Sequence, residues 1–175
     1  GCSKLAGEQA LRSAGCDYLI FRSAWVYAAR GHNFLRTMLR LGREREQLRI
    51  VNDQRGAPTS ARLIADATAL ALARMCARRA SDRAHFLGTF HLCAAGECSW
   101  FDFAGAIFTR ARAAGLIERV PALLPISTAD YPTKARRPAY SVLDHTKFQA
   151  TFGLHLPAWQ EGLDRVIGEM SAYRD

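Results

Sequence analysis

Four consecutive apolar residues, from Tyr18 to Phe21, constrain the fold of this chain more than any other stretch. A short, uninterrupted apolar run is typical of a strand that is buried on both faces. Such strands belong to parallel sheets, in which a helix usually connects one strand to the next. The run therefore predicts an α/β chain.

The rest of the sequence alternates as this fold class requires. Two further short strands are predicted at residues 48–53 and 88–96. Four prolines between residues 121 and 138 predict an extended or looped segment. Apolar residues at helical spacing predict helices near residues 1–11, 34–39, 60–75, 99–115, 145–153 and 157–170.

Polar side chains mark the beginning of three of these helices. Asn33 is placed to cap the helix that follows it, and either Thr59 or Ser60 caps the next one. Ser99 and Asp102 have the spacing of a capping box. The starts of these helices can therefore be predicted from local sequence.

The net charge of +8 would suit a nucleic-acid partner, but its location favours another interpretation. Much of the charge lies in residues 43–49 and 74–79, near the ends of predicted helices, where the helix dipole favours cations. No zinc-finger spacing or RNA-recognition motif accompanies it, so we expect no nucleic-acid partner. A basic surface still favours phosphate-bearing ligands.

Several familiar signatures are missing from the sequence. No apolar run approaches the roughly 20 residues of a membrane helix, so we expect a cytoplasmic protein without a membrane partner. The five cysteines include no C-x-x-C pair, which predicts free thiols rather than disulfides or a metal site. Neither G-x-G-x-x-G nor the P-loop motif occurs, so the chain has no visible nucleotide-binding turn of its own.

Seven motifs occur in an order that resembles the dTDP-4-dehydrorhamnose reductase family, a branch of the extended short-chain dehydrogenases. They are SKLAGE, FRSAWVY, HNFLRTML, VNDQRGAPTSARLIAD, FHLCAAGECSWFDFA, YPTKARRPAYSVLD and LPAWQEGL. The resemblance implies the C-terminal part of a Rossmann-like parallel sheet plus a smaller α/β substrate-binding domain. Residues 1–55 would be the remnant of the dinucleotide-binding domain. Residues 56–175 would mainly bind the nucleotide sugar, with some segments returning to the Rossmann domain.

The first motif aligns Lys4 with the lysine of the family's Tyr-x-x-x-Lys pair. Hydride transfer to a ketone puts negative charge on the carbonyl oxygen, so an acid must stand within hydrogen-bond reach. A tyrosine, with an ordinary pKa of about 10, needs a nearby cation to favour its phenolate. A lysine one helical turn away supplies that cation. The resemblance implies this role for Lys4, and taken alone Lys4 would be an ordinary exposed lysine.

The tyrosine of that pair would stand immediately before Gly1. We therefore expect a C-terminal fragment of a longer reductase, inactive by itself and without a bound cofactor. We also expect its open sheet to be covered by a second copy, as in a domain-swapped homo-oligomer.

The resemblance also implies the ligands and their residues. The cofactor of the parent protein would be NADPH or NADH, bound by Lys4 and by Ser23, which stands where the family has Ser or Thr. The partner would be a nucleotide-sugar substrate. The residues implied for the substrate are Trp25, Asn33, Gln54, Arg55, Arg136 and Arg137.

Three of these residues have a second interpretation. Trp25 offers a sugar an apolar face and one N–H donor, but a lone tryptophan is also a common core residue. Arg137 suits a diphosphate, because guanidinium binds phosphate oxygens bidentately, or it pairs with Asp144 and holds its own loop. Asn33 is first a helix cap and second a sugar contact.

The function implied for the parent protein is reduction of dTDP-4-dehydro-L-rhamnose to dTDP-L-rhamnose by hydride transfer from NADPH. Two alternatives stay open. One is a non-catalytic regulatory subunit of the same fold, and the other is a reductase that acts on another 4-keto nucleotide sugar.

Overall fold

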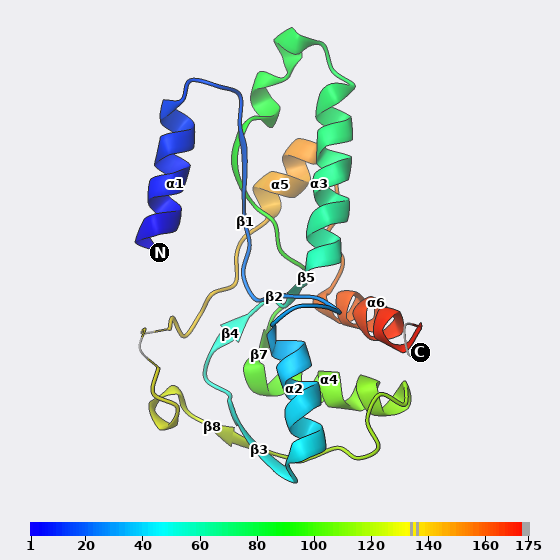
Figure 1. The fold of residues 1–175 in the computed structure, drawn as a ribbon. Helices are drawn as coiled ribbons and strands as arrows, with labels where there is room; N and C mark the ends of the chain where they lie inside the picture. Colours follow the sequence, from blue (N-terminus) through cyan, green and yellow to red (C-terminus); the bar gives the residue numbers. More distant parts are fainter. Residues whose placement is uncertain (134, 136, 173–175) are drawn as a thin grey trace.

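The structure, a computed structural model, describes residues 1–133, 135 and 137–172. The chain folds into two stacked halves (Figure 1). The upper half contains the helices α1 (Cys2–Ser13), α3 (Ala61–Cys76) and α5 (Thr146–Phe152). The lower half contains the helices α2 (Phe34–Glu44), α4 (Trp100–Ala113) and α6 (Trp159–Ala172).

The strands of the described residues form two longer and two shorter pairs. β1 (Leu19–Arg22) runs parallel to β6 (Gly88–His91), and β3 (Gln47–Val51) runs parallel to β8 (Ala122–Ile126). β2 (Val26–Tyr27) is parallel to β5 (Thr59–Ser60), whereas β4 (Arg55–Gly56) is antiparallel to β7 (Cys98–Ser99). The described residues also form three short 3-10 turns, namely η1 (Ala80–Asp82), η2 (Ala84–Phe86) and η3 (Thr128–Asp130). The predicted α/β class with parallel strands is confirmed.

Each half has its own apolar core. The lower core is centred on the fully buried Phe103, whose ring lies 5.2 Å from that of Tyr27 and 5.6 Å from that of Phe34. The upper core is centred on Phe90 of β6 and includes Phe148 of α5. Chain segments from both sides of residue 55 enter each core, so a domain division at that residue stays a prediction.

The local signals for helix starts are confirmed. The Asn33 side chain accepts a hydrogen bond from the first turn of α2. Ser60, rather than Thr59, caps α3 in the same way. Ser99 and Asp102 form both hydrogen bonds of the capping box. The five cysteines are free thiols, as predicted.

The burial predicted for the run Tyr18–Phe21 is wrong, although the strand itself is present. The apolar residues of β1 are only half-buried. Leu19 and Phe21 pack on the upper core, whereas Ile20 and Arg22 point to the opposite side because strand residues alternate. On that side lies α1, which has no buried residue. Burial on both faces needs an apolar layer on each side, and the described residues supply one.

The apolar stripe predicted for α3 is also wider than the buried face. Leu70 is 52% exposed, although its helical spacing with Leu63, Ala67 and Ala71 predicts a position on the same apolar face. The helix packs instead through the small side chains of Ala67 and Ala71, which bring its backbone close to the upper core.

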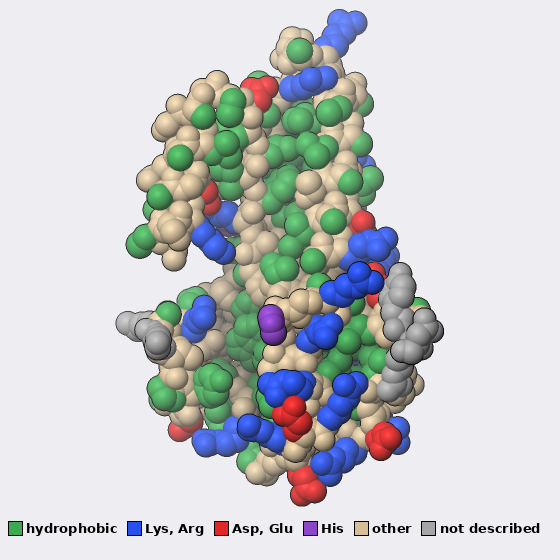
Figure 2. Space-filling view, in the orientation of Figure 1, with side chains coloured by type: hydrophobic (Ala, Val, Ile, Leu, Met, Phe, Trp, Pro, Cys, Tyr) green, Lys and Arg blue, Asp and Glu red, His purple; other side chains and the backbone are tan. Residues whose placement is uncertain are grey.

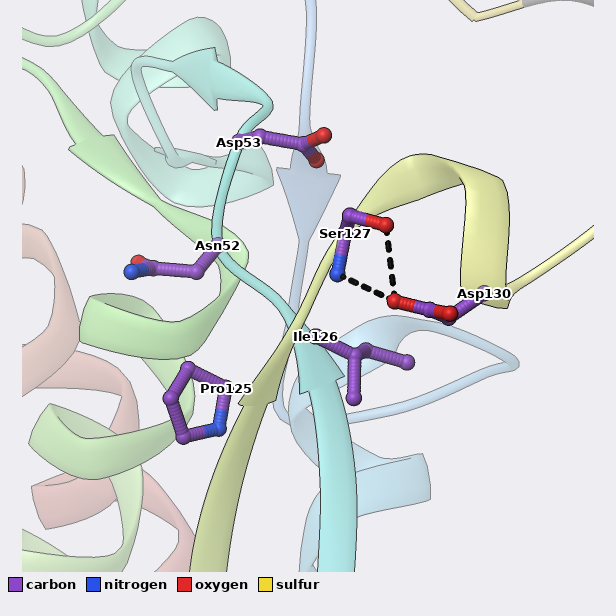
Figure 3. Close-up of a pocket in the computed structure, with 6 residues that line it drawn as sticks. All are labelled: Asn52, Asp53, Pro125, Ile126, Ser127 and Asp130. Carbon is purple, nitrogen blue, oxygen red and sulfur yellow. Dashed lines mark hydrogen bonds between the residues drawn. The ribbon is translucent and has the colours of Figure 1, made fainter.

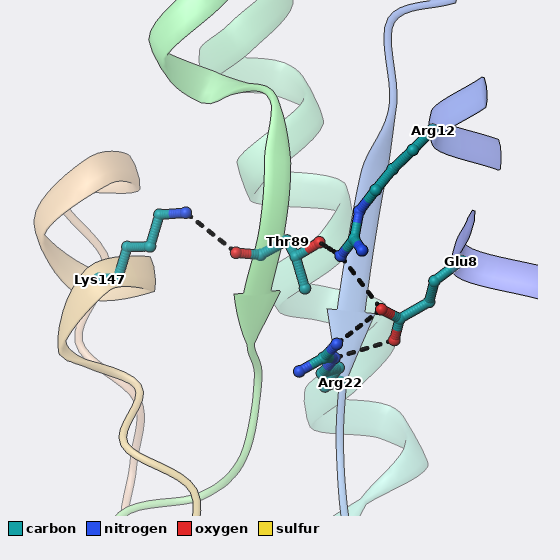
Figure 4. A network of polar contacts seen from close by, with 5 residues as sticks. All are labelled: Glu8, Arg12, Arg22, Thr89 and Lys147. Carbon is teal, nitrogen blue, oxygen red and sulfur yellow. Dashed lines mark hydrogen bonds and ion pairs between the residues drawn. The ribbon is translucent and has the colours of Figure 1, made fainter. Parts of the chain in front are cut away.

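Ion pairs, rather than apolar packing, hold α1 on the strands (Figure 4). Arg22 of β1 donates to both carboxylate oxygens of Glu8, at 2.9 and 2.7 Å. Arg12, one turn further along α1, donates to Glu8 at 3.2 Å and to the Thr89 hydroxyl of β6 at 2.9 Å. From α5, Lys147 donates to the backbone carbonyl of Thr89 at 3.0 Å. Polar contacts thus link α1, β1, β6 and α5.

The fold generates a first prediction at Gly42, where α2 lies against α4. A Cβ atom at Gly42 would stand 2.5 Å from Cε1 of the fully buried Phe108. Overpacking of this kind costs about 1–3 kcal/mol, which exceeds the roughly 0.5–1 kcal/mol that alanine gains over glycine in a helix. We expect Gly42→Ala to lower the free energy of unfolding by about 1–2 kcal/mol in a urea titration.

Gly105→Ala is the matched control, because the nearest atom to its new Cβ would be Leu123 Cδ1 at 3.9 Å. We expect this variant to be as stable as the wild type or more stable. A Gly42→Ala protein with undiminished stability would contradict the close approach of α2 to α4.

A second prediction concerns Glu8. Hydrogen bonds from Arg22, with the charges of Arg22 and Arg12, lower the pKa of the Glu8 carboxyl below its ordinary value of 4.5. A carboxylate with a lowered pKa stabilises the folded state above its ordinary value and loses that effect as the pH falls. We expect the protection of α1 amides from hydrogen exchange, corrected for intrinsic rates, to drop below pH 4.5.

Glu8→Gln should abolish this pH dependence and speed exchange in α1 at neutral pH. Glu44→Gln is the control, because Glu44 also pairs with an arginine one turn away, in a helix that is anchored by buried residues. Equal exchange of α1 in the wild type and Glu8→Gln would show that the ion pair does not hold the helix.

Candidate functional site

The first turn of α1 lies at the carboxyl end of β1 (Figure 1). The two elements run in opposite directions, and Glu8 of α1 meets Arg22, the last residue of β1. Lys4 precedes Glu8 by one turn and therefore shares its face of the helix. The exposed Lys4 thus extends past the end of β1, which is where open parallel sheets bind their ligands.

Ser23 follows β1 directly and has an unusual environment. Its hydroxyl oxygen is buried and has no hydrogen-bond partner among the described residues. Buried hydroxyl groups normally have a partner, because an unsatisfied one costs free energy. The Ser23 hydroxyl, like the buried hydroxyl of Tyr27, therefore lacks the partner that such a group normally has.

Trp25 lies further along the same loop, and the protein itself uses the groups that were predicted to face a sugar. Its indole stacks on Trp100 with ring centroids 3.4 Å apart and an interplanar angle of 6°. Its Nε1–H donates to the hydroxyl of Ser141 at 3.0 Å. One face of the indole and its single donor are thus engaged within the chain.

Gln54 and Arg55 were predicted to face a ligand, and both have partners within the protein. Gln54 Nε2 donates to the Thr128 hydroxyl at 3.0 Å, and Arg55 Nε donates to Glu97 at 2.7 Å. Glu97 also accepts from the Tyr140 hydroxyl at 2.6 Å. The hydrogen bonds from Tyr140 and Arg55 lower the pKa of Glu97, which keeps it ionised as the centre of this cluster.

Asn33 acts as a structural residue in this fold. Its Oδ1 accepts from the first turn of α2 at 3.1 Å, and its Nδ2 donates to the carbonyls of Ala28 and Arg30 at 2.9 and 3.1 Å. The helix cap predicted for Asn33 is confirmed, and the same side chain also closes the loop before α2.

Arg137 is exposed and lies at the start of a segment that runs beside β4. Arg55 N–H donates to the carbonyl of Ala139 at 2.7 Å, and Ser141 N–H donates to the carbonyl of Arg55 at 2.9 Å. Among the ion pairs of the described residues, none joins Arg137 to Asp144. The Asp144 carboxylate therefore does not hold the Arg137 side chain. Arg136 lies outside the described residues.

A small open hollow at the ends of β3 and β8 was not predicted (Figure 3). It contains Asp53, whose carboxylate accepts from the Thr128 backbone at 2.9 Å and from the Thr128 hydroxyl at 2.7 Å. These bonds lower the pKa of Asp53. Asp130 is similarly bound by Ser127, at 2.7 Å from its hydroxyl. The only sequence signal for this hollow was the position of Asp53 at the end of the strand predicted at residues 48–53.

Two kinds of feature are absent from the described part of the chain. It holds no group of three or more histidine, cysteine, aspartate or glutamate side chains arranged to bind a metal ion. None of its helices is both long and apolar enough to cross a membrane.

Comparison with known proteins gives a consistent answer. The family model for the RmlD substrate binding domain matches residues 1–172. The dTDP-4-dehydrorhamnose reductase of Escherichia coli K12 is 47% identical over 170 residues, which are 97% of this chain and 55% of the relative. That of Burkholderia thailandensis is 51% identical over 172 residues, which are 97% of this chain and 57% of the relative. The chain thus spans a little over half the length of these curated relatives.

A solved structure supports the same assignment. The crystal structure of dTDP-4-dehydrorhamnose reductase from Bacillus anthracis in complex with NADP is 35% identical, with a TM-score of 0.79. It matches over 96% of this chain and 54% of its own. With the family model covering nearly every residue, this chain belongs to the RmlD substrate binding domain family.

Proposed function

We propose that this chain is part of a reductase that converts dTDP-4-dehydro-L-rhamnose to dTDP-L-rhamnose with NADPH. The observation that carries the proposal is the unpartnered buried hydroxyl of Ser23 directly after β1, the strand whose last residue, Arg22, binds Glu8 of the helix that carries Lys4. Relatives of the same family that carry the reductase name cover this chain almost completely.

The residues at this strand end fit a nicotinamide cofactor. The Ser23 hydroxyl needs a partner, and a ribose hydroxyl can supply one. Lys4 is exposed on the helix that Glu8 attaches to this strand end, and its ammonium group is suited to donate to the same ribose. NADPH, when bound, supplies the hydride. The NADP held by the solved relative from Bacillus anthracis is consistent with this assignment.

The proton is proposed to come from a tyrosine one helical turn before Lys4, at the position that precedes Gly1. The positive charge of Lys4 favours the phenolate and so lowers the cost of giving up the proton. A codon other than one for tyrosine at that position would argue for the non-catalytic subunit instead.

The nucleotide sugar is proposed to bind between the end of β1 and the segment that carries Arg137. Arg137 is exposed, and among the described residues it forms no ion pair with Asp144. Its guanidinium suits the diphosphate of such a substrate. The ligand role is also proposed for Trp25 and for Arg136, whereas Asn33, Gln54 and Arg55 act by shaping the surrounding loops.

We further propose a cytoplasmic, homo-oligomeric protein with its dinucleotide-binding part in residues 1–55 and its sugar-binding part mainly in 56–175. The free cysteines suit a reducing compartment. The exposed Leu5 and Leu11 of α1 favour further packing on this helix, by a second copy or by another segment.

The proposal predicts that the complete gene product oxidises NADPH when dTDP-4-dehydro-L-rhamnose is added. Lys4→Met removes the charge while keeping the length of the side chain, and we expect kcat/KM to fall about 100-fold or more. Lys147→Met is the control, since Lys147 contacts a backbone carbonyl of β6 instead, and it should leave kcat/KM nearly unchanged. Turnover of a different 4-keto nucleotide sugar alone would support the alternative substrate.

A further prediction separates binding from chemistry. Arg137→Ala should raise the KM for the nucleotide sugar about 10- to 150-fold with little change in kcat, because a hydrogen bond to a charged group contributes about 1.5–3 kcal/mol. Arg40→Ala, which breaks an exposed ion pair on α2, is the control. An unchanged KM in Arg137→Ala would remove this residue from the substrate site.

A further inference from the structure

Trp25 is held in a backbone conformation that tryptophan rarely adopts. Its φ angle is 52°, and it is the only non-glycine residue with a positive φ in the described part of the chain. L-residues with a side chain avoid this region because of steric strain, which persists only where the surroundings enforce it. Such strain is often found at functional sites, so the contacts that enforce it are informative.

Two neighbours cover the two faces of the indole. Trp100 stacks on one face, with ring centroids 3.4 Å apart. Gly56 lies against the pyrrole atoms, and a Cβ there would overlap Cε2 and Nε1 of Trp25. Because the stacked ring occupies the first face, the backbone of Gly56 must lie on the second. Only glycine at position 56 allows this sandwich.

Hydrogen bonds then fix the edge of the indole. Trp25 Nε1–H donates to Ser141 Oγ at 3.0 Å, and the same hydroxyl donates to the carbonyl of Arg55 at 3.0 Å. Ser141 N–H donates to that carbonyl as well, at 2.9 Å. One serine therefore connects the loop after β1, strand β4 and the segment that follows Arg137.

A second contact supports the same segment. Tyr140 donates to Glu97 at 2.6 Å, and Glu97 accepts from Arg55 at 2.7 Å. With the bond from Arg55 N–H to the Ala139 carbonyl, the segment is attached at three consecutive residues, so loss of one side-chain contact should loosen it without releasing it.

We infer that Ser141 and Gly56 are positioning residues, which fix the Trp25 indole and link its position to that of the segment carrying Arg137. The inference rests on the proposed function for its ligand, a sugar joined to a diphosphate. The loop that carries Trp25 and the segment that carries Arg137 would then be held at a constant separation, which selects ligands by the distance between sugar and phosphate.

The first test needs no ligand. The stacked pair of Trp25 and Trp100 should give an exciton couplet in circular dichroism, and Trp100→Phe identifies this signal by removing it. We expect Ser141→Ala to reduce the couplet and Ser141→Thr, which keeps the hydroxyl, to restore it. Ser171→Ala is the control, because it removes a serine hydroxyl that bonds only within α6. An unchanged couplet in Ser141→Ala would overturn the positioning of Trp25.

The second test uses the complete gene product with NADPH and dTDP-4-dehydro-L-rhamnose. Ser141→Ala should raise the KM for the sugar about three- to tenfold, the effect of one lost hydrogen bond, and leave kcat unchanged. In a Trp25→Phe background, which already lacks the N–H donor, Ser141→Ala should not raise the KM for the sugar any further.

The outcomes distinguish the positioning role of Ser141 from the proposed reductase function. An unchanged KM in Ser141→Ala, or additive effects of the two substitutions, would overturn the link between the indole and the Arg137 segment. Wild-type protein without turnover would contradict the proposed function, while the couplet would still decide whether Ser141 positions Trp25. Because Gly56→Ala threatens folding, neither test depends on it.

Discussion

β1 and β6 pair in parallel up to Arg22 and His91, and both strands end at that pair. Leu92 N–H continues the ladder by donating to the carbonyl of Arg22 at 2.9 Å. The segments that follow β1 and β6 then cross into the lower half (Figure 1). Ser23 and Trp25 are positioned by this crossing, and Lys4 is positioned by the contact of Glu8 with Arg22. A register shift of one residue within β1 would turn Arg22 toward the upper core and Phe21 toward α1. Such a shift would disrupt both the crossing that positions Ser23 and Trp25 and the ion pair that positions Lys4.

The elements around this strand end are anchored in different ways. Trp100 packs against the lower core, in which Phe103 and other aromatic rings are fully buried. The hydrophobic effect and close packing hold this part.

Figure 2 shows hydrophobic side chains gathered on the upper half and lysine and arginine side chains gathered on the lower half. A phosphate-bearing ligand at the junction would meet the basic lower half, consistent with its proposed binding near Arg137.

The parts of this structure that could be predicted from sequence depend on neighbours along the chain. The Asn33 cap and the Ser99 capping box are formed within one helical turn, so local sequence determined them. The partners of Trp25, Gln54 and Arg55 come from 116, 74 and 42 residues away, and no local pattern specifies them. The half-buried state of β1 could not be predicted either, because the sequence of a strand shows its preference for an apolar environment but not which layers cover it.

Among the α-helices in the described part of the chain, α1 alone has no buried residue. Its position depends on an ion pair in which the Arg22 side chain is 44% exposed, so dissolved ions can compete with it. The screening length of salt falls from about 8 Å at physiological ionic strength to about 3 Å at 1 M, while apolar burial is not weakened in this way. Ionic strength should therefore act on the helix that carries Lys4 before it acts on either core. Salt can therefore loosen the attachment of α1 while both apolar cores stay folded, because different interactions hold these elements.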